Sequence, residues 1–125
     1  MSSAPAISIK PHAEVVCVVV HQPRLDDAAL VHLQRELPAA AAQQPNLPVV
    51  LDLTQVNYVP SMALGALVML MRHLKDSNQR FVLVGLQPDV RTVLAITRLD
   101  KLFEIQSNLE AALKQLRGSI PKEQK

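Results

Sequence analysis

The sequence predicts an α/β fold in which a mixed, mainly parallel sheet of about five strands is covered by about four helices. Short aliphatic runs alternate along the chain with longer segments of helical character, and this alternation is typical of β-α-β units. Several of the runs are apolar without interruption, as in strands covered on both faces. The length of 125 residues suits a single core. We expect one domain over residues 1–118 and a flexible polar tail over residues 119–125.

The first two predicted strands differ in how much of their surface they bury. Residues 6–10 alternate apolar and polar side chains, which predicts a half-buried edge strand. Residues 14–20 are dominated by valine, which predicts a strand covered on both faces. Cys17 lies inside this run and is the only cysteine, so we expect a buried thiol and no intrachain disulfide.

The first helix is predicted from its acidic start. Asp26 and Asp27 favour a helix N-terminus, because carboxylates stabilise the partial positive charge of that end, and we expect a helix over residues 27–43. Pro38 falls inside this helix and predicts a kink or a break. After a turn, residues 48–53 (PVVLDL) are almost entirely apolar and predict the central strand.

The second half of the chain continues the alternation. A loop leads into a segment rich in methionine, alanine and leucine, which are strong helix formers. A proline followed by an aspartate begins the next predicted helix, and a glycine closes the last one. The predicted elements are a loop over residues 54–60, a helix over 61–77, a strand over 80–86, a helix over 89–97, a short strand over 103–106 and a helix over 109–116 closed by Gly118.

The composition argues against nucleic acids and membranes as partners. The 13 basic and 11 acidic residues give a net charge of +2 and are mostly scattered, whereas nucleic-acid binding needs a clustered basic stripe. Only three aromatic side chains are available for base stacking. Residues 1–12 lack the features of a targeting segment, and the longest apolar stretch, residues 59–71, is shorter than the roughly 20 residues of a membrane span. We expect a cytoplasmic protein without direct membrane insertion.

The sequence contains no recognisable enzymatic motif. Its three glycines cannot supply a nucleotide-binding loop, and its four histidines lack metal-binding spacing. Ser61 lies between Pro60 and Met62, where a hydrolase nucleophile needs small neighbours. We therefore predict no catalytic residue, no metal site and no cofactor. A small enzyme that uses Ser61 or His73 is kept as a third hypothesis.

The helix predicted from residue 61 carries apolar side chains on two faces. At 100° per residue, the stripe expected to face the core collects Leu64, Leu67, Val68, Met71 and Leu74. The opposite side presents Met62, Ala66 and Met69. A surface helix needs one apolar stripe, so the second indicates contact with a neighbouring helix, another subunit or a partner. Two interpretations are equally open: the methionines form an adaptable recognition surface, or they lie under other helices of the same domain.

Ser61 also has two interpretations. As an N-cap it would accept a hydrogen bond from an early helix amide and stabilise the helix by about 1 kcal/mol. As a phosphorylation site it would gain a charge of about −1.5 to −2 beside Met62. The helix N-terminus favours an anion by about 0.3–1 kcal/mol, but burial of that anion in an interface costs several kcal/mol. Phosphorylation would then weaken partner binding and leave the fold intact.

Two segments, together with the N-terminal strand pair, extend over nearly the whole chain: PVVLDLTQVNYVPSMALGALVML and RFVLVGLQPDVRTVLAITRLDKLFEI. In this order and spacing the chain resembles the STAS family, the sulfate-transporter and anti-sigma-factor-antagonist domains. In the family, a strand ending in Asp-Leu leads to an Asp-Ser-Ser/Thr-Gly-Leu motif, whose first serine is phosphorylated. Ser61 aligns with that serine and Leu64 with the leucine. Pro60, Met62 and Ala63 stand where the motif has Asp, the second Ser or Thr, and Gly.

The resemblance implies a non-enzymatic bacterial regulatory module that acts like an anti-sigma factor antagonist. Such a module would bind a serine-kinase anti-sigma factor, or another switch protein, and release it when Ser61 is phosphorylated. The contact residues expected beside Ser61 are Asn57, Tyr58, Pro60, Met62, Ala66 and Met69. The alternative is a constitutive STAS scaffold, for example a subunit of a transporter complex, in which Ser61 only caps the helix. The sequence leaves the oligomeric state open, with a homodimer as one option.

Overall fold

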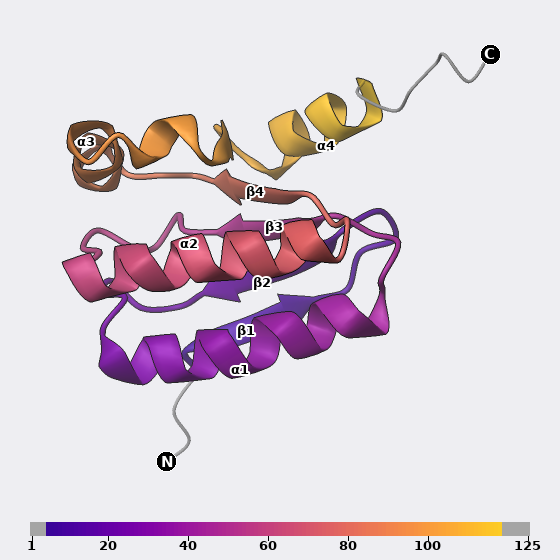
Figure 1. Ribbon diagram of the computed structural model, residues 1–125, viewed down its shortest axis with the longest axis horizontal. Helices are drawn as coiled ribbons and strands as arrows, with labels where there is room; N and C mark the ends of the chain where they lie inside the picture. Colours follow the sequence, from indigo (N-terminus) through magenta and orange to yellow (C-terminus); the bar gives the residue numbers. More distant parts are fainter. Residues whose placement is uncertain (1–4, 119–125) are drawn as a thin grey trace.

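The computed structural model describes residues 5–118 and has the predicted order of elements (Figure 1). The predicted α/β class, with five strands and four helices, is confirmed. The tail predicted over residues 119–125 lies outside the described residues. In chain order the elements are β1 (Ile7–Lys10), β2 (Val16–Val20), α1 (Asp27–Gln43), β3 (Val49–Asp52), α2 (Ser61–Asp76), β4 (Phe81–Val84), α3 (Pro88–Ile96), the 3-10 helix η1 (Leu99–Lys101), β5 (Glu104–Gln106) and α4 (Leu109–Gly118).

The five strands form one sheet in the order β1-β2-β3-β4-β5. β1 runs antiparallel to β2, and the other three pairings are parallel. β1 lies at an edge and β3 at the centre, as their sequences predicted. In Figure 1, α1 and α2 lie side by side over one face of the sheet, and α4 packs on the other face.

Successive residues of the central strands point into two separate apolar layers. The neighbouring pair Leu51 and Leu83 lies in the larger layer with α1 and α2, whereas Val50 and Val82 lie in the smaller layer with α4. Side chains alternate between the faces of a strand, so a strand covered on both faces buries every position. This arrangement explains the unbroken apolar runs of the sequence.

Helix α1 begins as predicted and is not broken at Pro38. Asp26 is its N-cap, and Asp26 Oδ1 accepts a hydrogen bond from the Ala29 amide at 3.0 Å. Leu37 and Ala41, on either side of the proline, are both buried, so tertiary packing holds the helix together across the position that the sequence marks as a breaker. No helix within residues 5–118 is long and apolar enough to cross a membrane.

Gly85, directly after β4, packs against the loop that follows β3. Its φ of +72° lies in the left-handed region that favours glycine. A Cβ atom at this position would lie 2.3 Å from Thr54 Oγ1, well inside van der Waals contact. The backbone after β4 therefore touches the segment that leads into α2.

We expect Gly85→Ala to lower the free energy of unfolding by about 2–4 kcal/mol. Left-handed backbone costs about 1–2 kcal/mol for other residues, and overpacking adds about 1–3 kcal/mol. The matched control is Gly65→Ala, because a Cβ at Gly65 meets open space in an exposed position of α2. That change should raise stability by about 0.5–1 kcal/mol. Urea denaturation measures both variants, and equal effects would contradict the close contact at Gly85.

Candidate functional site

Three loops meet at the edge of the sheet where the parallel strands end. They comprise residues 21–26 after β2, residues 53–60 after β3 and residues 85–87 after β4. Parallel strands share one direction, so their carboxyl ends lie at the same edge, where open α/β sheets commonly bind ligands. The middle loop leads into α2, whose first residue is Ser61, and Figure 1 shows the start of α2 at this edge.

Backbone hydrogen bonds join the middle loop to the loop after β2. The amides of Asn57 and Tyr58 donate to the Pro23 carbonyl at 2.8 and 3.1 Å, and the Leu25 amide donates to the Tyr58 carbonyl at 3.0 Å. The Arg24 guanidinium carbon lies over the Tyr58 ring, 4.7 Å from its centroid. These contacts fix the loop while Asn57 stays exposed and 47% of Tyr58 remains accessible.

The last residue of β4 and the chain that follows it support the same loop from the other side. The Leu53 amide donates to the Val84 carbonyl at 3.0 Å, and Gln87 Nε2 donates to the Thr54 carbonyl at 2.8 Å. Asp52 Oδ1 accepts hydrogen bonds from both the amide and the hydroxyl of Thr54. The loop is therefore anchored on both flanks before it enters α2.

Ser61 is the first residue of α2 and is exposed. The N-cap position is held by half-buried Pro60, with φ −70° and ψ 164°, and no side chain there makes a capping hydrogen bond. Of the two interpretations of Ser61, the one in which it acts as the N-cap is therefore wrong. The fixed φ of proline suits the extended cap conformation, and this moves the serine one position into the helix.

The first turn of α2 contains no acidic residue. Among the four α-helices within residues 5–118, the other three have an acidic residue in the first turn, namely Asp27, Asp89 and Glu110. The first turn of α2 has none. A helix N-terminus carries a partial positive charge. Of these four helices, α2 is the one whose first turn has no acidic side chain to offset that charge.

The outer face of α2 exposes two methionines. Met62 and Met69 are 68% and 65% exposed, but Ala66 is only 8% exposed. The predicted place of Ala66 on the outer face is therefore wrong. α2 packs against α1 as well as the sheet, and contact with two neighbours rotates and widens its buried stripe. That stripe consists of Ala63, Leu64, Ala66, Leu67, Leu70 and Leu74, whereas Val68 and Met71, predicted for the core, are half-buried.

The structure separates Ser61 from His73. His73 is exposed in the last turn of α2, and twelve helical residues correspond to about 18 Å along the axis. A general base must lie within about 3 Å of the proton it removes, so the two residues cannot form a nucleophile and base pair. Residues 5–118 also contain no group of three His, Cys, Asp or Glu residues placed to hold a metal ion.

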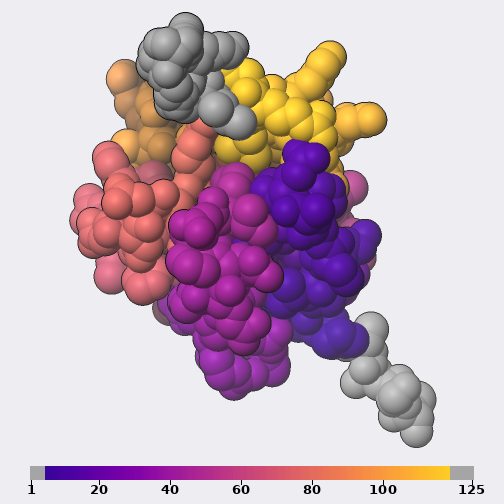
Figure 2. Space-filling model, turned by 90° about the vertical axis from the view of Figure 1, so that its right-hand side faces the viewer, coloured from indigo at the N-terminus to yellow at the C-terminus, as the bar shows by residue number. Residues whose placement is uncertain are grey.

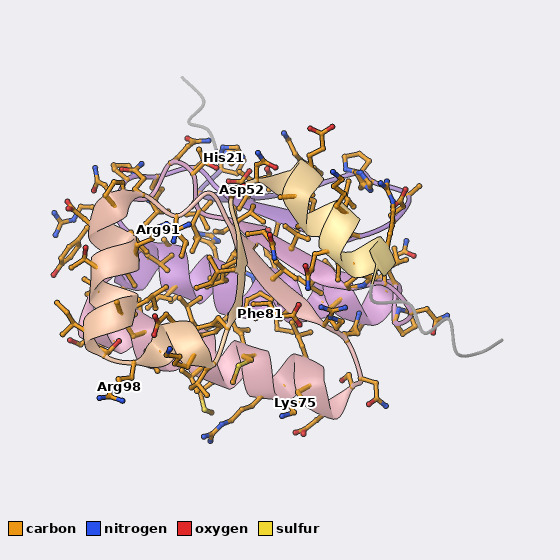
Figure 3. All side chains as sticks on the ribbon, turned by 90° about the horizontal axis from the view of Figure 1, so that it is seen from above. His21, Asp52, Lys75, Phe81, Arg91 and Arg98 are labelled. Atoms are coloured by element: carbon orange, nitrogen blue, oxygen red, sulfur yellow. The ribbon has the colours of Figure 1, made fainter. Side chains whose placement is uncertain are left out.

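A polar group around His21 adjoins the site and was not singled out from the sequence. His21 Nε2 lies 2.7 Å from Ser8 Oγ, and its Nδ1 lies 3.2 Å from Gln55 Nε2. Because the Gln55 amide donates to Nδ1, the ring hydrogen lies on Nε2, toward Ser8. Figure 3 shows His21 and Asp52 close together where β2 and β3 end. Ser8, His21 and Gln55 are far apart in sequence, so no local pattern could have grouped them.

The opposite end of the molecule has a separate groove. Figure 2 shows this end, where the C-terminal parts of α1 and α2 lie beside the β1–β2 hairpin and α4. A groove with a volume of about 730 Å³ lies here, with Leu47, Arg80 and Arg117 among its lining residues. None of the predicted site residues lines it, so it is distinct from the edge that carries Ser61.

These features define a class of protein: a small α/β domain that presents an exposed helix start and two exposed methionines beside the carboxyl edge of its sheet. The family model of the STAS domain matches residues 6–112. The chain therefore belongs to the STAS domain family.

Two relatives by sequence are consistent with this assignment. A STAS-domain containing protein of Pseudomonas aeruginosa (strain UCBPP-PA14) is 39% identical over 56 residues, which cover 45% of this chain and 55% of that protein. The match thus spans about half the length of this relative. BtrV of Bordetella bronchiseptica (strain ATCC BAA-588 / NCTC 13252 / RB50), whose name proposes an anti-sigma factor antagonist, is 29% identical over 98 residues, which cover 78% of this chain and 84% of BtrV.

Solved structures share the fold. An anti-sigma factor antagonist from Mycobacterium paratuberculosis has a TM-score of 0.76 at 28% identity, over 93% of this chain and 99% of that one. The anti-sigma factor antagonist SpoIIAA in its unphosphorylated form has a TM-score of 0.74 at 21% identity, over 92% of this chain and 99% of that one. The predicted resemblance to anti-sigma factor antagonists is confirmed at the level of family and fold.

Because Ser61 is not the N-cap, Ser61→Ala should change the free energy of unfolding by less than about 0.5 kcal/mol. The matched control is Asp26→Ala, which removes the N-cap hydrogen bond of α1 and should cost about 1 kcal/mol. Chemical denaturation of both variants at neutral pH gives the comparison. A loss for Ser61→Ala as large as that for Asp26→Ala would restore the capping role to the serine.

Proposed function

We propose that the chain is a bacterial regulatory binding module of the anti-sigma factor antagonist kind, without enzymatic activity and located in the cytoplasm. Its partner is a serine-kinase anti-sigma factor, or another switch protein, which contacts the start of α2 and the loop before it. Phosphorylation of Ser61 releases this partner. The observation that carries the proposal is the exposed Ser61 at a helix start without a side-chain capping hydrogen bond, directly beside the exposed Met62.

The proposed contact surface combines a supported aromatic ring with flexible apolar side chains. Tyr58 stands on a loop anchored to its neighbours, and aromatic residues held in this way commonly dominate binding energy. Met62 and Met69 project from a helix that is itself packed on the sheet and on α1. Unbranched thioethers adapt to the shape of a partner. The surface therefore combines a rigid backbone with side chains that can adjust to the partner.

A phosphate on Ser61 would have opposite effects on the free domain and on the complex. In the free domain the anion would lie in water at the N-terminus of α2, whose first turn has no acidic residue, and this helix end favours an anion by about 0.3–1 kcal/mol. In the complex it would be buried beside Met62, where an unpaired charge costs several kcal/mol. The second effect is larger, and each 1.4 kcal/mol lowers affinity tenfold. Phosphorylation therefore weakens binding while the fold remains stable.

Similar proteins support this switch. SpoIIAA, which shares the fold, has been solved in its unphosphorylated and its phosphorylated form, with TM-scores of 0.74 and 0.66 to this chain. At 21% and 18% identity these structures show the fold alone. The likeness supports a phosphorylated state that keeps the architecture, and the exposure of Ser61 supports access by a kinase.

A constitutive STAS scaffold is the second candidate function. The departures at Pro60, Met62 and Ala63 from the motif expected of the family favour it. The fold also occurs in the murine anion transporter Slc26a9, with a TM-score of 0.74 at 17% identity, over 88% of this chain and 19% of that one. In this case the partner would bind permanently and Ser61 would stay unmodified.

Affinity capture from the native cell tests the proposal. The baits are the wild-type chain, Ser61→Ala and Ser61→Asp, where the aspartate stands in for part of the phosphate charge. The wild type and Ser61→Ala should retain a protein with a kinase-type ATPase domain, and Ser61→Asp should retain at least about tenfold less, because the charge enters the apolar contact. Incubation of the retained ATPase with ATP should add one phosphate to the wild type, measured by intact mass, and none to Ser61→Ala.

The matched control is Asn46→Asp, which adds the same charge at an exposed position between α1 and β3, at the opposite end of the molecule from Ser61, and should bind as the wild type does. Equal retention of a membrane transporter by all four baits would replace the switch with the scaffold. Loss of binding by Asn46→Asp as well would show that net charge, and not the position of Ser61, controls the interaction.

A further inference from the structure

The sulfur atoms of α2 fall into two environments. Met62 and Met69 are two helical turns apart, lie on one face and expose about two thirds of their side chains. Met71, on the same helix, is half-buried and packs against the core. The two exposed thioethers thus belong to the surface proposed above for partner binding, and both are open to small reagents in water.

We propose that Met62 and Met69 form an oxidation site whose conversion to methionine sulfoxide weakens partner binding, in addition to the phosphorylation of Ser61. The proposal rests on the proposed function for its consequence, since the oxidised face must be the docking face. The modification itself depends only on the exposure of the two side chains.

The step is a two-electron transfer of oxygen from a hydroperoxide to sulfur. The thioether sulfur attacks the distal peroxide oxygen, a new S–O bond forms and the O–O bond breaks. With hydrogen peroxide, the oxygen transferred to sulfur loses its proton and the leaving hydroxide takes up a proton to become water. Sulfur is thereby oxidised to the sulfoxide and the peroxide is reduced to water. Methionine sulfoxide reductases reverse the change with thiol reductants, which makes the modification suitable for regulation.

The remaining sulfur of the core is poorly placed to compete. Cys17 is 3% exposed in β2, and burial, together with the charge of Asp52, raises the pKa of its thiol. The thiolate is the form that reacts with peroxides, so this cysteine stays protonated and shielded. Among the sulfur atoms of residues 5–118, peroxide therefore meets Met62 and Met69 first.

The fold should tolerate these sulfoxides because both side chains already lie in water. A sulfoxide converts an apolar side chain into a polar one, which is costly in a core and harmless on an exposed face. In a complex, the new S=O group would be removed from water against an apolar surface, and a buried polar group without a hydrogen bond is unfavourable. Oxidation therefore weakens partner binding and leaves the stability of the fold unchanged, as phosphorylation of Ser61 does.

The first test needs no partner. The folded chain is treated with hydrogen peroxide, the reaction is stopped with catalase, and sulfoxide at each methionine is measured by peptide mass spectrometry over time. Met62 and Met69 should react several-fold faster than Met71, the denaturation midpoint should be unchanged at the stage when only these two are oxidised, and retention on phenyl-agarose should fall. Equal rates at the three positions, or a lowered midpoint, would overturn the proposal.

The second test measures binding to the ATPase retained in the capture experiment. The oxidised, catalase-treated chain should bind at least about tenfold more weakly than the untreated chain. The Met62→Leu/Met69→Leu variant keeps an apolar face without reactive sulfur, so its binding should be the same before and after peroxide. Met71→Leu is the matched variant and should remain sensitive. Full binding by the oxidised wild type would overturn the proposal while the Ser61 switch stands.

Failure of the proposed function would give a different result. In that case the wild type retains no ATPase, but Met62 and Met69 are still oxidised selectively and phenyl-agarose retention still falls. The proposed partner is then wrong, whereas the oxidation site remains and makes this face of α2 more polar.

Discussion

The parallel pairing of β3 with both β2 and β4 is the constraint on which the candidate site depends. It places three strand ends at one edge of the sheet, and the loops that follow then become neighbours. The loop before α2 is hydrogen-bonded to Pro23 on one side and to Gln87 on the other, and Gly85 allows the backbone after β4 to approach Thr54 closely. The exposed Ser61 therefore stands on a supported frame, and a charge added there can change binding with little effect on the frame.

Helix α2 serves two surfaces. Its buried stripe meets both the sheet and α1, so it contributes to the larger core, while Met62 and Met69 remain in water on its outer face. Phosphorylation of Ser61 and oxidation of the methionines would both act on this outer face. Their consequences follow from one asymmetry: a polar or charged group costs little in water at a helix start, and much when a partner removes that water.

Most of the fold could be predicted from local patterns. The unbroken apolar runs predicted covered strands because both faces of β2, β3 and β4 are buried, and Asp26 correctly marked the start of α1. The exposure of Met62 and Met69 was one of two open interpretations. Ala66 was misplaced because helical periodicity finds an apolar face without knowing how many neighbours will cover it, and here α1 covers part of it. The break offered as one outcome at Pro38 does not occur, since α1 continues through it with buried neighbours on both sides.

By itself the amino-acid sequence determined the order of strands and helices, the resemblance to the STAS family and the position of Ser61 at a helix start. These depend on periodicity, on capping chemistry and on the order of short motifs, all of which act over a few residues. The tertiary structure decided that Ala66 is buried and that His21 joins Ser8 to Gln55. Such facts depend on contacts between segments far apart in the chain, and these form only when the strands are paired in register.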